Sequence, residues 1–269
     1  MMEWFKKVLD EDWDITPAGG LTGEAYFAKK DSKQLFLKRN SSPFLAVLSA
    51  EGIVPKLVWT KRMHNGDVVT AQKWLEGREL KPVEMQHQRV VDLLHKIHHS
   101  TELLHMLLRL GKKPITADGC MQSIEKRLTA NNIKNASIEI SDGMSYLSKY
   151  LTVARQHKQT VCHGDMNHHN VLLTDDNQLF LIDWDNAMVA DPISDYGKVL
   201  NSYIPKENWK NWLTNYGVQL DNQFLIRMYW YLIADALTFL AFHFERNEHD
   251  KYEERLISLK ELNFQMRLL

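Results

Sequence analysis

Three oxygen-bearing side chains, Asp165, Asn170 and Asp183, fall within one segment that is predicted to form a polar loop and a β-hairpin. Because a hairpin returns the chain to the end at which it began, the Asn170 amide and the Asp183 carboxylate are expected at the same end. Phosphoryl transfer from a metal nucleotide needs a base for the acceptor hydroxyl and oxygen ligands for magnesium. The pattern therefore predicts Asp165 as the base and Asn170 and Asp183 as the magnesium ligands.

The residues around these three favour a site over an ordinary loop. Gly164 lets the loop His163–Asn170 turn without a steric penalty. The apolar run Leu179–Ile182 predicts a buried strand that presents Asp183 at its tip. The simpler interpretations, a loop that caps a hairpin and an acidic strand end that faces solvent, do not explain why both acids belong to one hairpin. Asp185 is a further candidate metal ligand.

Histidines in the same loop, His163, His168 and His169, raise zinc as an alternative metal. A zinc site needs three or four ligands that converge on one point. His168 and His169 are adjacent, so their side chains are expected to diverge on a loop or strand, which disfavours zinc. His163 is expected to brace the loop by a hydrogen bond between its ring and the backbone.

Upstream residues are candidates for binding nucleotide phosphates. Lys38 ends an apolar strand, and a buried ammonium needs a partner such as a phosphate. The alternative is an edge-strand lysine at a solvent face. The glycines Gly19, Gly20 and Gly23 precede this strand and are suited to fold over phosphates with backbone N–H groups. Their spacing matches neither a Walker pattern nor a complete G-x-G-x-x-G motif.

The elements that position these residues change in kind along the chain, which predicts an α+β protein with a boundary at Gly77. Before Gly77, two hairpins and one short helix are expected, and after it the pattern is mostly helical. The expected strands are Ala25–Ala28, Gln34–Arg39, Val54–Trp59 and Asp67–Leu75, with a helix from Pro43 to Ala50. The expected later helices are Val83–Ser100, Asp118–Asn131 and Ser141–Gln156, followed by a largely helical region from 193 to 269.

The composition excludes several classes of protein. A net charge of -1 over 269 residues gives no global basic field, so no nucleic-acid partner is expected. The two cysteines make no metal-spaced motif, and together with the absence of a signal-like N-terminus they predict a reduced, cytoplasmic protein. The apolar stretch Phe224–Phe244 is interrupted by Arg227, Asp235 and His243, so it is expected to be a buried helix without membrane insertion.

Taken together, the motifs resemble the aminoglycoside phosphotransferase and choline kinase family, which are relatives of protein kinases. The segment His163–Asn170 matches the catalytic loop of that family, and Ile182–Asp185 matches its metal motif. Asp191–Asp195 matches the segment that follows. Gln72–Leu80 is similar to the hinge between the lobes, and Leu93–His98 to the next helix. The resemblance covers about residues 14–200.

The resemblance implies a two-lobed, protein-kinase-like fold with ATP and Mg²⁺ as cofactors. A small β-rich lobe, residues 1–77, would bind the nucleotide, and a larger helical lobe, residues 78–269, would carry the catalytic loop and the acceptor. By the same resemblance Lys38 would contact the nucleotide phosphates, and Asp195 would orient the catalytic loop. Backbone contacts to adenine would come from Gln72, Lys73 and Trp74.

Two departures from the family pattern stand out. The segment Ser41–Ala50 lacks the helix glutamate that usually pairs with the strand lysine, and Glu51 follows at its end. No long activation segment separates Asp183 from Asp191, which argues against a protein kinase. Within the family, the chain is similar to cell-cycle regulator kinases of Gram-positive bacteria. That similarity implies phosphorylation of a ribose-like sugar or nucleoside, a role in division, and a division protein as a further partner.

The acceptor is expected in the helical lobe. An aromatic wall would suit a sugar face or a nucleobase, although the same aromatics also fit a protein core. The candidate lining residues are Trp184, Asp185, Trp209, Trp212, Tyr229, Trp230 and Asp235. An aminoglycoside, choline or ketosamine kinase is the alternative enzyme, and it would use acids such as Glu245, Asp235 and Asp195 to bind an amine. A catalytically weak, kinase-like scaffold is the alternative that lies outside enzymes.

Overall fold

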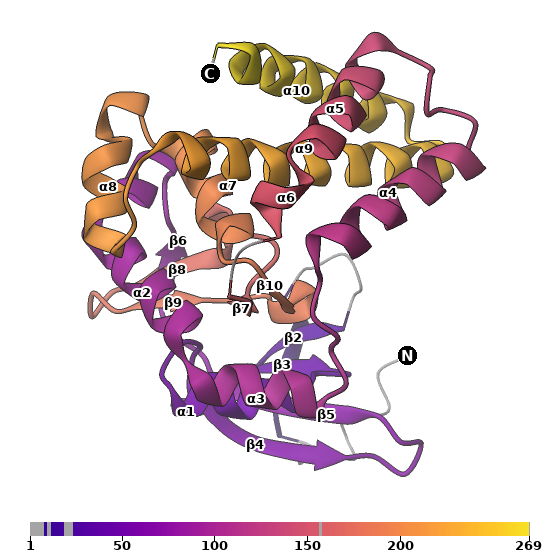
Figure 1. The fold of residues 1–269 in the computed structure, drawn as a ribbon. Coiled ribbons are helices and arrows are strands. Elements are labelled where there is room, and N and C mark those ends of the chain that lie inside the picture. The colour runs from indigo at the N-terminus through magenta and orange to yellow at the C-terminus, as the bar shows by residue number, and fades with distance from the viewer. Residues whose placement is uncertain (1–7, 10–11, 19–23, 156–157, 269) are drawn as a thin grey trace. The chain divides into compact units, whose positions relative to one another are not determined.

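The computed structural model describes residues 8–9, 12–18, 24–155 and 158–268 (Figure 1). The chain forms two compact units, of which the first contains residues 1–80 and 168–185 and the second contains 81–167 and 186–269. The sequence interpretation assigned the hairpin at 168–185 to the later part of the chain, whereas it packs with the earlier part. The division into domains 1–77 and 78–269 stays a prediction, because compact units are not a test of independent folding.

The first unit is built on a five-stranded antiparallel sheet with the order β1-β2-β3-β5-β4. Its strands are β1 (Asp14–Pro17), β2 (Ala25–Lys30), β3 (Lys33–Arg39), β4 (Leu57–Arg62) and β5 (Val68–Lys73). Along β3, Leu35 and Leu37 are buried in the core of the sheet. Because side chains alternate between the two faces of a strand, Lys38 leaves the sheet on the opposite face from these leucines.

A second, three-stranded sheet contains the hairpin between Asn170 and Asp183 that carries the predicted magnesium ligands, here called the metal hairpin. It consists of β6 (Gly77–Glu79), β8 (Val171–Thr174) and β9 (Leu179–Leu181), all antiparallel. Gly77 is required here, since a Cβ atom at this position would lie 2.5 Å from the carbonyl oxygen of Leu173. The Leu181 N–H donates to the Ile53 carbonyl at 2.9 Å, just after helix α1 (Phe44–Ala50). The hairpin is thus fastened to the rest of the first unit.

The second unit is mostly helical and packs around α9 (Asn222–Glu245), with α10 (His249–Arg267) alongside it (Figure 1). A two-stranded sheet of β7 (Thr160–Cys162) and β10 (Met188–Ala190) leads into and out of the catalytic segment. The other helices are α2 (Gln88–His99), α3 (Thr101–Arg109), α4 (Ala117–Ala130), α5 (Ile138–Lys149), α6 (Leu151–Ala154), α7 (Ile193–Tyr203) and α8 (Trp209–Tyr216).

Most predicted elements are present, and two differences have local causes. The helix expected over Val83–Ser100 is divided into a 3₁₀ turn, η2 (Pro82–Gln86), and α2, because His87 between them is extended. Helix α3 was not predicted, and it begins where the Ser100 hydroxyl accepts the Leu103 N–H. Helix α9 is long and apolar enough to cross a membrane, but 67% of its most apolar window is buried in the structure. That burial favours a core helix.

Candidate active site

One end of the metal hairpin gathers Asn170, Asp183 and Lys38 within the first unit. Asn170 ends a 3₁₀ turn, η3 (His168–Asn170), and its carbonyl accepts the Ile182 N–H at 2.8 Å. This bond puts Asn170 and Asp183 at the same end of the hairpin, as the spacing predicts. The backbone of Asp183 has φ of 60°, in the left-handed region that residues other than glycine seldom adopt. Such a conformation persists where the surroundings impose it, often at functional sites.

Lys38 is held by the two acids of the metal motif. Its Nζ lies 2.8 and 2.9 Å from the two Asp185 carboxylate oxygens and 3.5 Å from Asp183 Oδ1. The family pattern pairs this lysine with a helix glutamate, and the sequence left open whether Glu51 replaces it. Among the described residues, Lys38 forms ion pairs with Asp183 and Asp185. The lysine therefore reaches the site from β3 as predicted, although an acid of the hairpin, not of the helix, fixes its ammonium.

The donor set at this end fits a hard, oxygen-seeking cation. Asp183 and Asp185 offer carboxylate oxygens beside the Lys38 ammonium. Asn170, which has an amide side chain, lies at the same end of the hairpin. Carboxylate and amide oxygens are the ligands that magnesium prefers. His169 pairs with Glu79 on β6, and the first unit contains no group of three histidine, cysteine or acidic ligands among its described residues. The zinc alternative thus gains no support from this segment.

Trp184 and the hinge residues have structural roles in the first unit. The Trp184 ring packs against Phe44 with centroids 5.6 Å apart, and its Nε1–H donates to the Leu181 carbonyl at 2.8 Å. The Lys73 and Trp74 N–H groups donate to the carbonyls of residues 56 and 34, so these two donors are not free to bind a base. An adenine contact from Gln72–Trp74 would therefore have to use groups other than these two N–H donors. Gly19, Gly20 and Gly23 lie outside the described residues.

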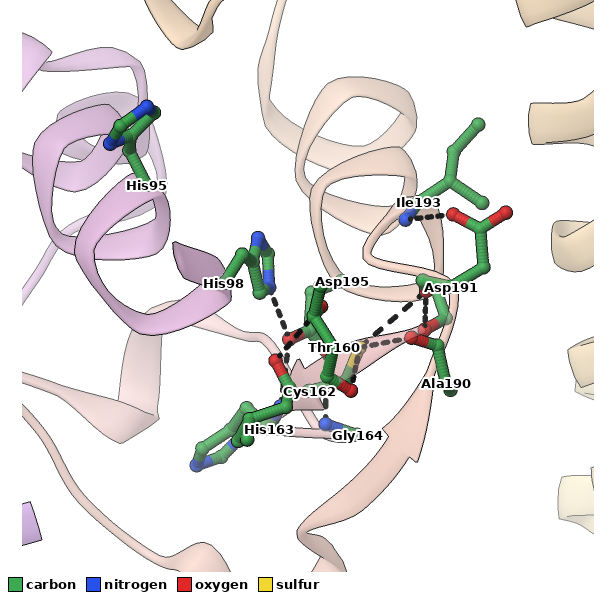
Figure 2. A network of polar contacts seen from close by, with 12 residues as sticks. His95, His98, Thr160, Cys162, His163, Gly164, Ala190, Asp191, Ile193 and Asp195 are labelled. Atoms are coloured by element: carbon green, nitrogen blue, oxygen red, sulfur yellow. Dashed lines mark hydrogen bonds and ion pairs between the residues drawn. The ribbon is translucent and has the colours of Figure 1, made fainter. Parts of the chain in front are cut away.

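In the second unit, a buried carboxylate holds the backbone just before Asp165 (Figure 2). Asp195 is fully buried, and its two oxygens accept the N–H groups of His163 at 2.7 Å and Gly164 at 2.9 Å. Gly164 has φ of 82°, and a Cβ atom there would lie 2.5 Å from the Asn186 carbonyl oxygen. The Asp165 N–H then donates to His163 Nδ1 at 3.3 Å. This is the geometry that an orienting role for Asp195 and a bracing role for His163 require.

His98 completes this arrangement from α2. Its Nε2 lies 3.0 Å from Asp195 Oδ2, and its Nδ1 lies 2.6 Å from the Tyr216 hydroxyl. Only an N–H can donate to a carboxylate, so Nε2 carries a proton. Burial acts to raise the pKa of Asp195, but the His98 hydrogen bond and charge, with His163 and Gly164, outweigh it and hold that pKa below its ordinary value. Asp195 is therefore an anion at neutral pH.

Asp165 lines a cavity of about 700 Å³ that lies wholly within the second unit. Its carboxylate accepts a hydrogen bond from the Asn167 side-chain amide at 3.2 Å. The rest of the wall comes from α7, η5 (Lys206–Asn208), α9 and α10. Its charged and aromatic members are Lys198, Tyr203, Lys206, Asp235, Phe239, Arg255 and Glu261. A base candidate in a cavity of this size is what an acceptor site requires.

The predicted aromatic wall is wrong for the second unit. Four of the expected lining residues are at most 4% exposed and lie in the helical core, and neither described cavity has them on its wall: Trp209, Trp212, Tyr229 and Trp230. Asp235 alone among the predicted acceptor residues of this unit faces the cavity with Asp165. The large aromatics of this region fill the interior, which is the alternative that the sequence left open.

Sequence reasoning missed His98, Tyr216 and the cations of the cavity. His98 falls on the buried face of α2 with Leu94, and a polar residue on an apolar stripe is the signal that could have marked it. No comparable signal marks Tyr216. Lys198, Lys206 and Arg255 come from three different elements, so nothing in their spacing shows that they converge.

The fold and these two residue groups define a kinase-like phosphotransferase. The model of the family described as "Phosphotransferase enzyme family" matches residues 14–226, and the chain belongs to that family. The predicted class, a small-molecule phosphotransferase with a hydroxyl acceptor, is thereby confirmed.

Solved structures show the same fold at low sequence identity. Choline kinase LicA from Streptococcus pneumoniae is 16% identical with a TM-score of 0.68, over 96% of this chain and 99% of that one. The GDP complex of aminoglycoside 2'-phosphotransferase-IIIa is 14% identical with a TM-score of 0.71, over 97% and 96%. Macrolide 2'-phosphotransferase type I is 14% identical with a TM-score of 0.61, over 92% and 90%. The predicted α+β, kinase-like fold is confirmed.

Proposed function

We propose that this phosphotransferase uses MgATP to phosphorylate a hydroxyl of a ribose-like sugar or a nucleoside. The observation that carries the proposal is Asp165 on the wall of an acceptor-sized cavity, directly after a backbone turn that Asp195 fixes. Nucleotide use is supported by related folds that were solved with AMP and GDP. Similarity to bacterial cell-cycle regulator kinases motivates the further proposals of a role in division, a division-protein partner and a cytoplasmic location.

The first unit would bind the metal nucleotide. Asn170, Asp183 and Asp185 would hold magnesium, which neutralises phosphate charge when it is bound. Lys38, already directed by the two acids, would bind a phosphate oxygen as a point charge. These roles need no histidine, in agreement with the support role proposed for His163.

The second unit would bind and activate the acceptor. Asp165 would accept the proton of the attacking hydroxyl at its carboxylate, while Asn167 holds one of its oxygens. Asp195 and His98 would act through the backbone, because neither of them lines the described cavities and both are buried. They are positioning residues.

The experiment is acceptor-dependent release of ADP from MgATP by the purified protein, with ribose, 2-deoxyribose and nucleosides as acceptors. Asp165→Ala should lower turnover about 10²–10⁴-fold, the usual contribution of one general base. Asn208→Ala, in the exposed η5 turn, is a control that should not change turnover. Equal turnover by Asp165→Ala and the wild-type protein would refute the assignment of the base. Nucleotide binding without any transfer would favour the scaffold alternative.

A further inference from the structure

Each of the acids expected to bind an amine acceptor already has a hydrogen-bond or ion-pair partner within the second unit. Asp195 is fully buried against His98 and two backbone N–H groups. Both oxygens of Glu245 are bound by the Arg127 guanidinium, at 3.0 and 2.5 Å. Asp235, the one that faces the cavity, has an ion pair with Lys198 at 2.8 Å. A cationic acceptor would have to displace a lysine to reach it.

The Phe239 ring on the cavity wall is also already in contact with cations. Arg255 Cζ lies 5.1 Å from the Phe239 ring centroid, and Lys198 Nζ lies 6.0 Å from the same centroid. A quaternary or primary amine is bound in proteins by the electron-rich face of such a ring together with an acid. One acid and one ring of the wall, Asp235 and Phe239, are therefore already in contact with cations of the chain itself.

The remaining charges of the wall favour an anion. Arg255 is half-buried, and within the described part of the chain it has no carboxylate partner. Lys206 donates to the amide oxygen of Gln265 and lies over the Trp209 ring, and among the described residues no carboxylate is paired with it. Glu261 is the opposing carboxylate, but it is exposed, so water and salt screen it more than they screen Arg255. Asp165 belongs to the reacting end.

We propose that the cavity takes an acceptor that carries an anionic group besides its reacting hydroxyl, with Arg255 as the main contact and Lys206 as the second. The chemical class is a sugar or nucleoside that bears a phosphate or carboxylate. This inference rests on the proposed function, since it names the acceptor of the same site. Arg255 has the fork of donors that matches such groups, and within the described residues the guanidinium contacts the Phe239 ring and has no carboxylate partner.

The test is calorimetric binding of three probes, ribose, ribose 5-phosphate and glucosamine, to the wild-type protein and to three variants. Wild type should bind ribose 5-phosphate at least about 10-fold more tightly than ribose, and glucosamine least tightly. Arg255→Met keeps the apolar stem and should weaken binding of ribose 5-phosphate about 10–100-fold. Lys206→Met should weaken it less, because that lysine is exposed. Lys260→Met, on the exposed side of α10, is the matched control and should change nothing.

The outcomes separate this inference from the proposed function. Equal or weaker binding of ribose 5-phosphate than of ribose would overturn the anionic acceptor, whatever the turnover. Tighter binding that Arg255→Met does not reduce would also overturn it. Phosphorylation of ribose with no preference for the anion would leave the proposed function standing and refute only the inference. Tight, Arg255-dependent binding without phosphoryl transfer to any probe would support the inference and contradict the proposed function.

Discussion

Asp195→Asn tests how much the buried carboxylate contributes to the catalytic loop. Asp195 accepts three hydrogen bonds, two from the backbone and one from His98, with no exposure to water. Asparagine has the same shape but only one acceptor oxygen. Placed at the Oδ2 position, that oxygen keeps the His163 and His98 contacts and turns an NH₂ group toward the Gly164 N–H. One buried donor is then left without an acceptor.

The magnitude follows from these losses. An unsatisfied buried N–H costs about 1–3 kcal/mol, and replacing a charged acceptor by a neutral one weakens the bonds that remain. The free energy of unfolding should therefore fall by about 3 kcal/mol, which agrees with the cost of breaking a buried charge pair. For a chain of this size the melting temperature should fall by about 6–12 °C. A loop displaced by about 1 Å would lower turnover about 100-fold.

Urea unfolding, thermal melting and acceptor-dependent ADP release measure the two effects separately. The matched control is Asp221→Asn, because Asp221 caps α9 through the Phe224 N–H and asparagine is an equally good cap. Asp221→Asn should change stability by less than about 0.5 kcal/mol. If Asp195→Asn unfolds like the wild-type protein and keeps its turnover, the positioning role of Asp195 is refuted.

Two further predictions concern the same loop. Gly164→Ala should lower turnover far more than Gly217→Ala. Both glycines have positive φ (82° and 92°), but only at Gly164 would the new Cβ clash, with the Asn186 carbonyl. Equal activities of the two variants would contradict this. The pH dependence of stability should also change in Asp195→Asn. Folding lowers the pKa of Asp195, so its carboxylate stabilises the folded protein above its ordinary pKa of 3.8. This stabilisation is lost as the pH falls through the lower pKa of the folded state. The difference in unfolding free energy between wild type and variant should therefore shrink below about pH 4, and a constant difference would refute the assigned ionisation.

The sequence predicts short-range geometry within the hairpin. Asn170 and Asp183 could be placed at one end of it because a hairpin fixes which of its residues lie together. The roles of Asp165, Asn170 and Asp183 stay predictions. Lys38 could be assigned to its strand, but not to its partner, since the choice between Glu51 and Asp185 depends on contacts far apart in the chain. Residue spacing over short stretches of the sequence therefore indicates the type of reaction, but not contacts between distant residues.

The acceptor side could not be predicted in the same way. Trp209, Trp212 and Trp230 are equally apolar in a core or on a pocket wall, and only packing decides between the two. Cations such as Arg255 enter the cavity from a helix that has almost no amphipathic pattern of its own. Convergence of side chains from α7, α9 and α10 is a tertiary property, and no spacing rule along the sequence expresses it.

The most direct test of the central claim is a crystal structure with magnesium, a non-hydrolysable ATP analogue and an acceptor. The account predicts an acceptor hydroxyl within about 3 Å of the Asp165 carboxylate, the reach of a catalytic base, with the metal on Asp183 and Asn170 and Lys38 at the phosphates. An acceptor bound elsewhere, with no hydroxyl in reach of Asp165, would contradict it.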